Sequence, residues 1–286
     1  MLYLNGEFLP ASEAKVSALD RGCLFGDGVY EVVPVYSRHP FRLEEHLARL
    51  ESSLATIELP NPYPRAEWAR LIHQLIVMQD FDDQSVYFHV TRGSAYERDF
   101  PFPANVAPTV LINPTPLITP SAQTKASGVR AISHVDFRWL RCDIKSLNLL
   151  PAVLMREAAR RVGCAETVLF RDGFLSEGAA SNIFVVKDGV VFTPPKSHLI
   201  LPGITYDVVI ELCQNNGVPL EIRAVAEAEV RAADELWMTS STKEVLALVE
   251  LDGLPVGNGT VGPLAQRLDA LYQNFKNQVM RSGLAS

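Results

Sequence analysis

The stretch Phe137-Arg-Trp-Leu-Arg-Cys-Asp-Ile-Lys-Ser-Leu-Asn-Leu-Leu150 places a single lysine, Lys145, shortly before an apolar run. Burying a charged ammonium among apolar side chains is costly, and desolvation makes the neutral amine available for Schiff-base chemistry. A lysine at a strand end can instead extend its ammonium to solvent, and this arrangement is the commoner one. The local pattern therefore makes Lys145 a candidate catalytic residue and leaves the exposed alternative open.

Two further segments place polar groups where a flat, anionic ligand could bind. The run Ser176-Glu-Gly-Ala-Ala-Ser-Asn-Ile-Phe184 sets Glu177 before small residues, which leave room for a ligand near the backbone. The run Leu201-Pro-Gly-Ile-Thr-Tyr-Asp207 enters a predicted helix through a glycine, so the N–H groups of Ile204 and Thr205 could bind a phosphate. Ordinary alternatives exist, because Glu177 could be a solvated turn residue and Thr205 a helix cap.

Hydroxyl and guanidinium groups add two more candidates. The run Met238-Thr-Ser-Ser-Thr-Lys243 offers consecutive hydroxyls, Ser241 among them, that could bind phosphate oxygens or satisfy a turn. Arg49 lies near the polar edge of a predicted helix, where it could be exposed or could bind phosphate. The sequence contains no Walker, Rossmann, Gly-Xaa-Ser-Xaa-Gly or metal-ligand pattern, which argues against nucleotide, serine-hydrolase and metal chemistry.

The hydrophobic pattern predicts strands alternating with helices. The clearest helix is expected over 43–59, where leucines recur at helical spacing. The run Asn113-Pro-Thr-Pro-Leu-Ile-Thr-Pro-Ser121 predicts an extended connector, because proline fixes φ and removes a donor. We expect a small N-terminal α/β domain over 1–118, a linker over 119–125 and a larger C-terminal α/β domain over 126–286 that carries Lys145. Other helices are expected over 65–79, 149–163, 205–216 and 263–280, and strands over 2–8, 29–36, 86–91, 109–112, 167–170, 175–177, 182–186, 190–193, 235–239 and 245–251.

Composition and charge narrow the classes of function. The net charge is −7 and the pI about 5.4, so an acidic surface would repel nucleic acid. The spacing of the four cysteines fits neither a disulfide framework nor a metal site, which favours a reducing compartment. The sequence shows no signal-peptide pattern and no apolar run of membrane-spanning length. We therefore expect a cytoplasmic protein without nucleic-acid or membrane partners.

Taken together and in order, these segments resemble a known family. The lysine stretch 137–150 is strongly similar to that of the D-amino acid aminotransferases, class IV aminotransferases of fold type IV that use pyridoxal 5′-phosphate (PLP). The resemblance implies two α/β domains with mixed sheets and flanking helices, with PLP in the cleft between them. It also implies a homodimer with its active site near the interface. The other matching segments are 20–31, 45–50, 90–93, 177–182, 201–205 and 239–242.

The resemblance also implies a role for each candidate. Lys145 would hold PLP through a Schiff base and then move a proton to and from the substrate Cα. Glu177 would keep the pyridine nitrogen protonated, which makes the ring an electron sink. Arg49, the N–H groups of Ile204 and Thr205, and Ser241 would bind the phosphate, Leu201 would pack against the ring, and Tyr30 would help hold the substrate carboxylate.

One segment departs from the family pattern. Members carry an Arg-Xaa-His pair shortly after the Thr-Arg-Gly motif, whereas this chain reads Ser94-Ala-Tyr-Glu-Arg-Asp-Phe-Pro101 and lacks the histidine. Arg98 is the best candidate for the carboxylate clamp, and by resemblance its loop would come from the partner chain. Arg92 and Arg138 are the next arginines to consider.

The implied reaction is transamination between a D-amino acid and a 2-oxo acid, such as D-alanine with 2-oxoglutarate to give pyruvate and D-glutamate. Two enzymes of the same fold are rivals: 4-amino-4-deoxychorismate lyase and a branched-chain L-amino acid aminotransferase. A non-catalytic PLP-binding protein is a third alternative, which the presence of Lys145 and Glu177 disfavours.

Overall fold

The computed structural model describes residues 1–284, which fall into two compact units. The first contains 1–117, Ile144–Leu149 and the chain from Lys276, and the second contains Ile118–Asp143 and Leu150–Phe275. The lysine segment therefore belongs to the first unit, whereas the sequence pattern placed it in a C-terminal domain over 126–286. No helix of the described residues combines the length and apolar character needed to cross a bilayer.

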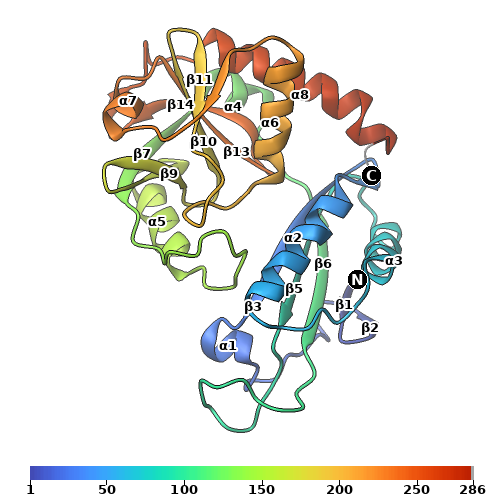
Figure 1. Cartoon of the computed structure of the whole chain (residues 1–286). Helices are drawn as coiled ribbons and strands as arrows, with labels where there is room; N and C mark the ends of the chain where they lie inside the picture. The colour runs from blue at the N-terminus through green and yellow to red at the C-terminus, as the bar shows by residue number, and fades with distance from the viewer. Residues whose placement is uncertain (285–286) are drawn as a thin grey trace. The chain divides into compact units, whose positions relative to one another are not determined.

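A six-stranded sheet organises the first unit (Figure 1). The expected Asn5-Gly6 hairpin is present, and both of its turn residues have positive φ. The long strands β3, β5 and β6 pair antiparallel in the middle of the sheet. The strands are β1 (Leu2–Leu4), β2 (Glu7–Leu9), β3 (Gly28–Tyr36), β4 (His39–Pro40), β5 (Gln84–Thr91) and β6 (Thr109–Pro116), in the order β2-β1-β6-β5-β3-β4.

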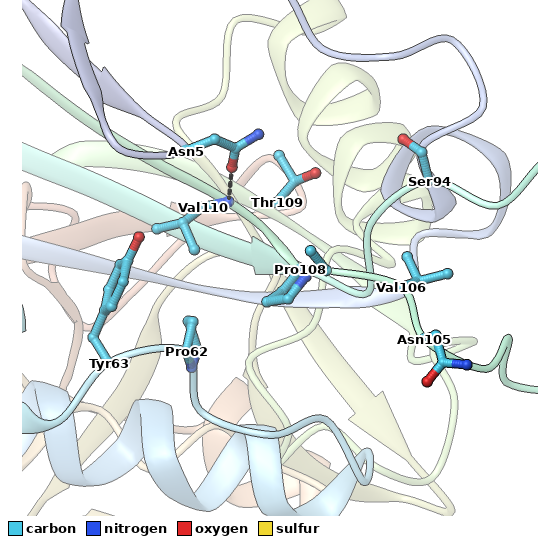
Figure 2. A pocket seen from close by; sticks show the side chains of 10 residues that line it. Asn5, Pro62, Tyr63, Ser94, Asn105, Val106, Pro108, Thr109 and Val110 are labelled. Atoms are coloured by element: carbon cyan, nitrogen blue, oxygen red, sulfur yellow. Dashed lines mark hydrogen bonds between the residues drawn. The ribbon is translucent and has the colours of Figure 1, made fainter.

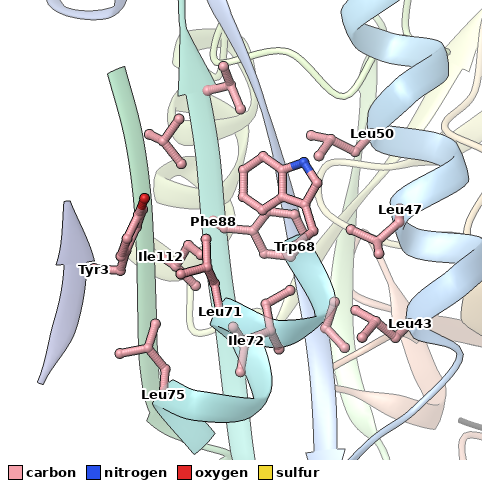
Figure 3. Packing of buried hydrophobic residues seen from close by; sticks show 14 of the residues in the cluster. Tyr3, Leu43, Leu47, Leu50, Trp68, Leu71, Ile72, Leu75, Phe88 and Ile112 are labelled. Atoms are coloured by element: carbon pink, nitrogen blue, oxygen red, sulfur yellow. The ribbon is translucent and has the colours of Figure 1, made fainter. Parts of the chain in front are cut away.

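Helices α2 (Leu43–Thr56) and α3 (Arg65–Val77) bury one apolar stripe each against this sheet. Trp68 of α3 is fully buried, and its ring lies 5.4 Å from that of Phe88 on β5 (Figure 3). Because successive residues of a strand face opposite sides, Val29, Glu31 and Val33 share one face and Tyr30 the other. Shorter helical segments are α1 (Arg21–Phe25) and the 3₁₀ turn η1 (Met280–Ser282).

The second unit is built on a nine-stranded mixed sheet. Its strands are β7 (Val129–Val135), β8 (Glu166–Arg171), β9 (Phe174–Gly178), β10 (Asn182–Lys187), β11 (Val190–Thr193), β12 (Leu220–Ile222), β13 (Glu235–Ser240), β14 (Glu244–Leu251) and β15 (Leu254–Pro255). The path runs β12-β11-β10-β13-β14-β7-β8-β9, with β15 beside β14. The helices are α4 (Ala122–Ser127), α5 (Leu150–Arg161), α6 (Ile204–Asn215), α7 (Glu227–Arg231) and α8 (Pro263–Gln278), of which the residues from Lys276 belong to the first unit.

The proline-rich run differs from its expected role as a connector. Strand β6 continues through Pro114 to Pro116, paired with β5, and α4 occupies much of the expected linker. Strand β1 pairs with β6 only at Leu111 and Ile112, so the prolines lie where the neighbouring edge of β6 has no β1 partner. Proline is tolerated at such an edge because no ladder hydrogen bond depends on its missing N–H.

Candidate active site

The lysine segment is fixed to the free edge of β3 in the first unit. The backbone N–H of Tyr30 donates to the carbonyl of Lys145 at 2.9 Å, and that of Leu147 donates to Gly28 at 3.0 Å. An isolated bridge pairs Val29 with Ser146. The backbone on both sides of the lysine therefore behaves as an additional strand, which fixes the origin of the Lys145 side chain.

The Lys145 side chain is half-buried rather than extended into solvent. Its Nζ lies 4.2 Å from the centroid of the Tyr30 ring, within cation–π distance. The Tyr30 ring in turn lies 5.7 Å from that of Tyr87 on β5. The aromatic side chains of Tyr30 on β3 and Tyr87 on β5 thus lie beside one another next to the amine, so the structure brings Tyr30 and Lys145 together.

Arg49 is held by a buried carboxylate that the sequence analysis did not single out. Its Nε and Nη2 donate to the two oxygens of Glu31 at 2.7 and 2.8 Å. His46 Nδ1 lies 2.8 Å from Glu31 Oε2, and both Glu31 and His46 are fully buried. Burial raises the pKa of Glu31, but Arg49 and His46 outweigh it and hold that pKa far below its usual range. Burial lowers the pKa of His46, which favours the neutral imidazole.

Glu177 is the buried acid at the centre of the second unit's polar groups. Arg138 Nη1 donates to its Oε1 at 2.6 Å, and the Leu201 N–H donates to both oxygens at 3.1 and 3.2 Å. Asn182 Nδ2 donates to Oε2 at 3.2 Å. Burial raises the pKa of Glu177 to about 7, although Arg138 and the Leu201 N–H lower it. The acid is therefore not the solvated turn residue that its local sequence allowed.

Asn182 links this acid to the start of α6. Its amide also donates to the Leu201 carbonyl at 3.0 Å, and it is paired with Thr239 across β10 and β13. Gly203 is the N-cap, and a Cβ there would come within 2.2 Å of the Asn182 amide oxygen, so any other residue would displace the Asn182 side chain. No side chain among the described residues caps this N-terminus. Its N–H groups, with Ile204 and Thr205 both buried, therefore point outward from the helix start.

The hydroxyl run lies at the end of β13. The Thr239 hydroxyl is buried and has no hydrogen-bond partner among the residues that the structure describes. Ser241 is half-buried in the turn that follows, where the Lys243 N–H donates to the Ser240 hydroxyl at 3.2 Å. A buried hydroxyl without a partner is costly, which favours a ligand at this place.

The arginines considered for the substrate carboxylate differ in availability. Arg98 is exposed, with its guanidinium 4.9 Å from the Phe25 ring, so its role stays a prediction. Arg92 binds Asp27 at 2.9 Å and two backbone carbonyls. Arg138 binds Asp136 and Glu177. Because carboxylates already occupy Arg92 and Arg138, both fit a supporting role better than a clamp.

A separate hollow opens on the first unit (Figure 2). Its volume is about 590 Å³, and Asn5, whose side-chain oxygen accepts from the Val110 N–H at 2.7 Å, forms part of its wall. None of the candidate residues lines it, and neither does any charged side chain. The hollow is therefore distinct from the groups described above.

Comparison with known proteins identifies the family. Residues 28–251 match the model of the amino-transferase class IV family. This chain therefore belongs to the class IV aminotransferases and is a PLP-dependent enzyme. It is 40% identical to D-alanine aminotransferase of Bacillus licheniformis over 270 residues, which cover 94% of this chain and 95% of the relative. It is 35% identical to D-alanine aminotransferase of Listeria monocytogenes over 280 residues, covering 98% and 96%.

Solved structures agree with the family. The branched-chain amino acid aminotransferase of Escherichia coli is similar with a TM-score of 0.88 at 27% identity, over 97% of this chain and 93% of that one. The branched-chain amino acid aminotransferase of Thermoproteus uzoniensis, solved with norvaline, has a TM-score of 0.86 at 26% identity, over 99% and 95%. A further branched-chain amino acid aminotransferase, solved with pyridoxamine 5′-phosphate, has a TM-score of 0.89 at 26% identity, over 99% and 94%. The expected fold class, with mixed sheets and flanking helices, is confirmed.

The residues present fit PLP group by group. The cofactor has a carbonyl that requires an amine, a ring nitrogen that requires an acid, and a phosphate. The first unit offers the Lys145 amine and the Arg49 guanidinium. The second offers the buried Glu177 carboxylate, the uncapped start of α6 and the unpartnered Thr239 hydroxyl.

Proposed function

We propose that this enzyme transfers the amino group of a D-amino acid to a 2-oxo acid, with D-alanine and 2-oxoglutarate giving pyruvate and D-glutamate. The observation that carries the proposal is the identity of 40% with a D-alanine aminotransferase over nearly the whole chain. Free D-amino acids and 2-oxo acids are its partners.

Lys145 would hold PLP through its Nζ, and the same amine, once free of PLP, would accept the substrate Cα proton and return it. Bound PLP supplies the electron sink for this chemistry. Glu177 would supply a negative charge to the ring nitrogen of PLP and so hold a proton there. The buried position of Glu177 supports this role, because water does not screen its charge.

The phosphate is bound by the Arg49 guanidinium, the Ser241 hydroxyl and the N–H groups of Ile204 and Thr205. A helix N-terminus and a guanidinium both favour an anion, and Glu31 fixes the direction of the guanidinium. Leu201 would pack against the ring of PLP, while its backbone N–H fixes Glu177.

Tyr30 and Arg98 bind the substrate carboxylate, with the Arg98 loop supplied by the second subunit of a homodimer. The aromatic residues Tyr96 and Phe100 on this loop are exposed at 93% and 74%, which supports a loop that another chain covers. We place the enzyme in the cytoplasm, and light scattering of the purified protein tests the dimer.

A branched-chain L-amino acid aminotransferase is the second candidate, because the solved neighbours bear that name. A panel of D-alanine, L-leucine and 4-amino-4-deoxychorismate, each with 2-oxoglutarate where an acceptor is needed, separates the candidates. We expect pyruvate and D-glutamate from D-alanine. Turnover of L-leucine with formation of L-glutamate, or release of p-aminobenzoate, would overturn the proposal. Lys145→Ala is the inactive control.

A further inference from the structure

Arg138 joins two buried carboxylates of the second unit. Its Nε and Nη2 each bind one oxygen of Asp136 at 2.9 Å, and its remaining nitrogen, Nη1, binds Glu177 at 2.6 Å. The Asp136 side chain is fully buried, and those of Glu177 and Arg138 are exposed by only 5% and 13%. The fork of Arg138 is thus oriented by one carboxylate and directed at the other.

The surroundings of Asp136 make this orientation rigid. The Ser176 hydroxyl donates to Asp136 Oδ2 at 2.9 Å, and Arg171 Nη2 lies 3.1 Å from the same oxygen. Arg171 also donates to the Arg138 carbonyl at 3.0 Å. With Glu177 and Asp136 ionised, their two negative charges balance those of Arg138 and Arg171. Loss of Arg138 would leave a buried cluster with a net negative charge.

We propose that Arg138 is a positioning residue that keeps the Glu177 carboxylate ionised and directed, and so sets the lower limit of the pH range in which the enzyme works. The inference rests on the proposed role of Glu177.

The physical reason is the balance of effects on Glu177. The pKa of Glu177 is raised to about 7 by burial above all and by Asp136, against the lowering effects of Arg138 and then of the Leu201 N–H. Asn182 contributes a neutral donor. Without Arg138, burial and Asp136 would raise the pKa further and leave a neutral acid at pH 7. A neutral acid cannot hold a proton on the ring nitrogen electrostatically.

The test compares Arg138→Met with Arg171→Met in the holoenzyme. Both changes remove one cation bound to Asp136, but among the described residues no hydrogen bond or ion pair joins Arg171 to Glu177, whereas Arg138 binds it. The acid limb of the kcat/KM profile should move upward in Arg138→Met by about one pH unit or more, the shift one charged partner produces. Arg171→Met should move the acid limb less. Arg138→Lys should also show a smaller shift than Arg138→Met, because lysine keeps the positive charge.

A second measurement does not depend on turnover. Binding of PLP to the apoenzyme can be followed by fluorescence quenching across pH. At pH 7 the dissociation constant should rise about tenfold or more in Arg138→Met, and much less in Arg171→Met. Equal effects of the two variants on the pH profile, or no shift in Arg138→Met, would overturn the inference. If Arg138→Met does not fold, the same comparison with Arg138→Lys decides, because a lysine cannot bind both carboxylates in the same fork.

A double variant separates this inference from the assignment of Glu177. If Arg138 acts through Glu177, Arg138→Met adds no further shift to Glu177→Gln. If Glu177→Gln itself has no effect on activity, the proposed role of Glu177 fails. If Glu177→Gln is impaired but Arg138→Met keeps the wild-type profile, only the inference about Arg138 fails. The amino donor is whichever amino acid the wild type accepts.

Discussion

Replacing Glu31 with glutamine tests whether the buried ion pair under α2 supports the phosphate-binding arginine. Glu31 is fully buried and accepts from Arg49 twice and from His46 once. Removing one partner of a buried ion pair lowers the free energy of unfolding by about 3–5 kcal/mol. Because glutamine keeps the shape and one acceptor, we expect Glu31→Gln to lower it by about 3 kcal/mol. For a protein of this size that corresponds to a lower Tm by roughly 6–12 °C.

Glu51→Gln is the matched control. Glu51 lies on α2, as Arg49 does, and binds Arg65 through both of its oxygens, at 2.9 and 2.6 Å. The geometry is the same as for Glu31 and Arg49, but the side chains of Glu51 and Arg65 are 35% and 44% exposed. Such a pair is worth about 0–1 kcal/mol. Calorimetry of both variants should therefore show a large loss for Glu31→Gln and almost none for Glu51→Gln.

The effect of Glu31→Gln on stability should also depend on pH, in a direction that the pKa of Glu31 determines. Arg49 and His46 hold the pKa of Glu31 well below its usual range despite burial. The stability it contributes is therefore complete above the unfolded pKa of about 4.3 and is lost as the pH falls through the folded pKa. The difference in Tm between wild type and Glu31→Gln should shrink below about pH 4. A similar loss in both variants, or a difference that grows in acid, would refute the reasoning.

Two further predictions concern the cofactor and the substrate. Glu177→Gln should retain PLP but transaminate far more slowly in single-turnover kinetics, and a loss of only a few-fold would mean that Glu177 does not partner the ring nitrogen. Arg98→Ala should weaken transition-state binding in the reaction of D-amino acids by about 2 kcal/mol or more. The reaction of a primary amine without a carboxylate should be almost unchanged. An equal loss for both substrates would make Arg98 structural.

Local sequence patterns predicted the helices and strands better than they predicted which segments belong to the same compact unit. The helix expected over 43–59 forms over Leu43–Thr56, and the Asn5-Gly6 hairpin is present. Periodicity is a local property, so it locates elements along the chain. The attachment of Lys145 to the edge of β3 depends on pairing between residues more than a hundred positions apart, which periodicity does not contain.

The partners of the candidate residues were missed for a similar reason. Glu31 and His46 lie inside the segments 20–31 and 45–50 that carry the resemblance. His46 lies one turn before Arg49 on α2, but only the packing of α2 against β3 brings Glu31 to both. Asp136 and Arg138 offered a local signal, an acidic and a basic residue two positions apart at the start of the lysine stretch. The proline run predicted an extended connector where β6 continues to Pro116, because tolerance of proline in a strand depends on whether that strand edge is paired.

Borohydride reduction followed by peptide mapping tests the central claim most directly. The imine that joins PLP to its lysine is reducible, so treatment of the yellow holoenzyme should fix one phosphopyridoxyl group, and mass spectrometry of the peptides should find it on Lys145. Lys125 and Lys243 are the internal controls, and Lys125 is bound to Glu244 and Asp269. A label on either of these lysines instead of Lys145 would contradict the account.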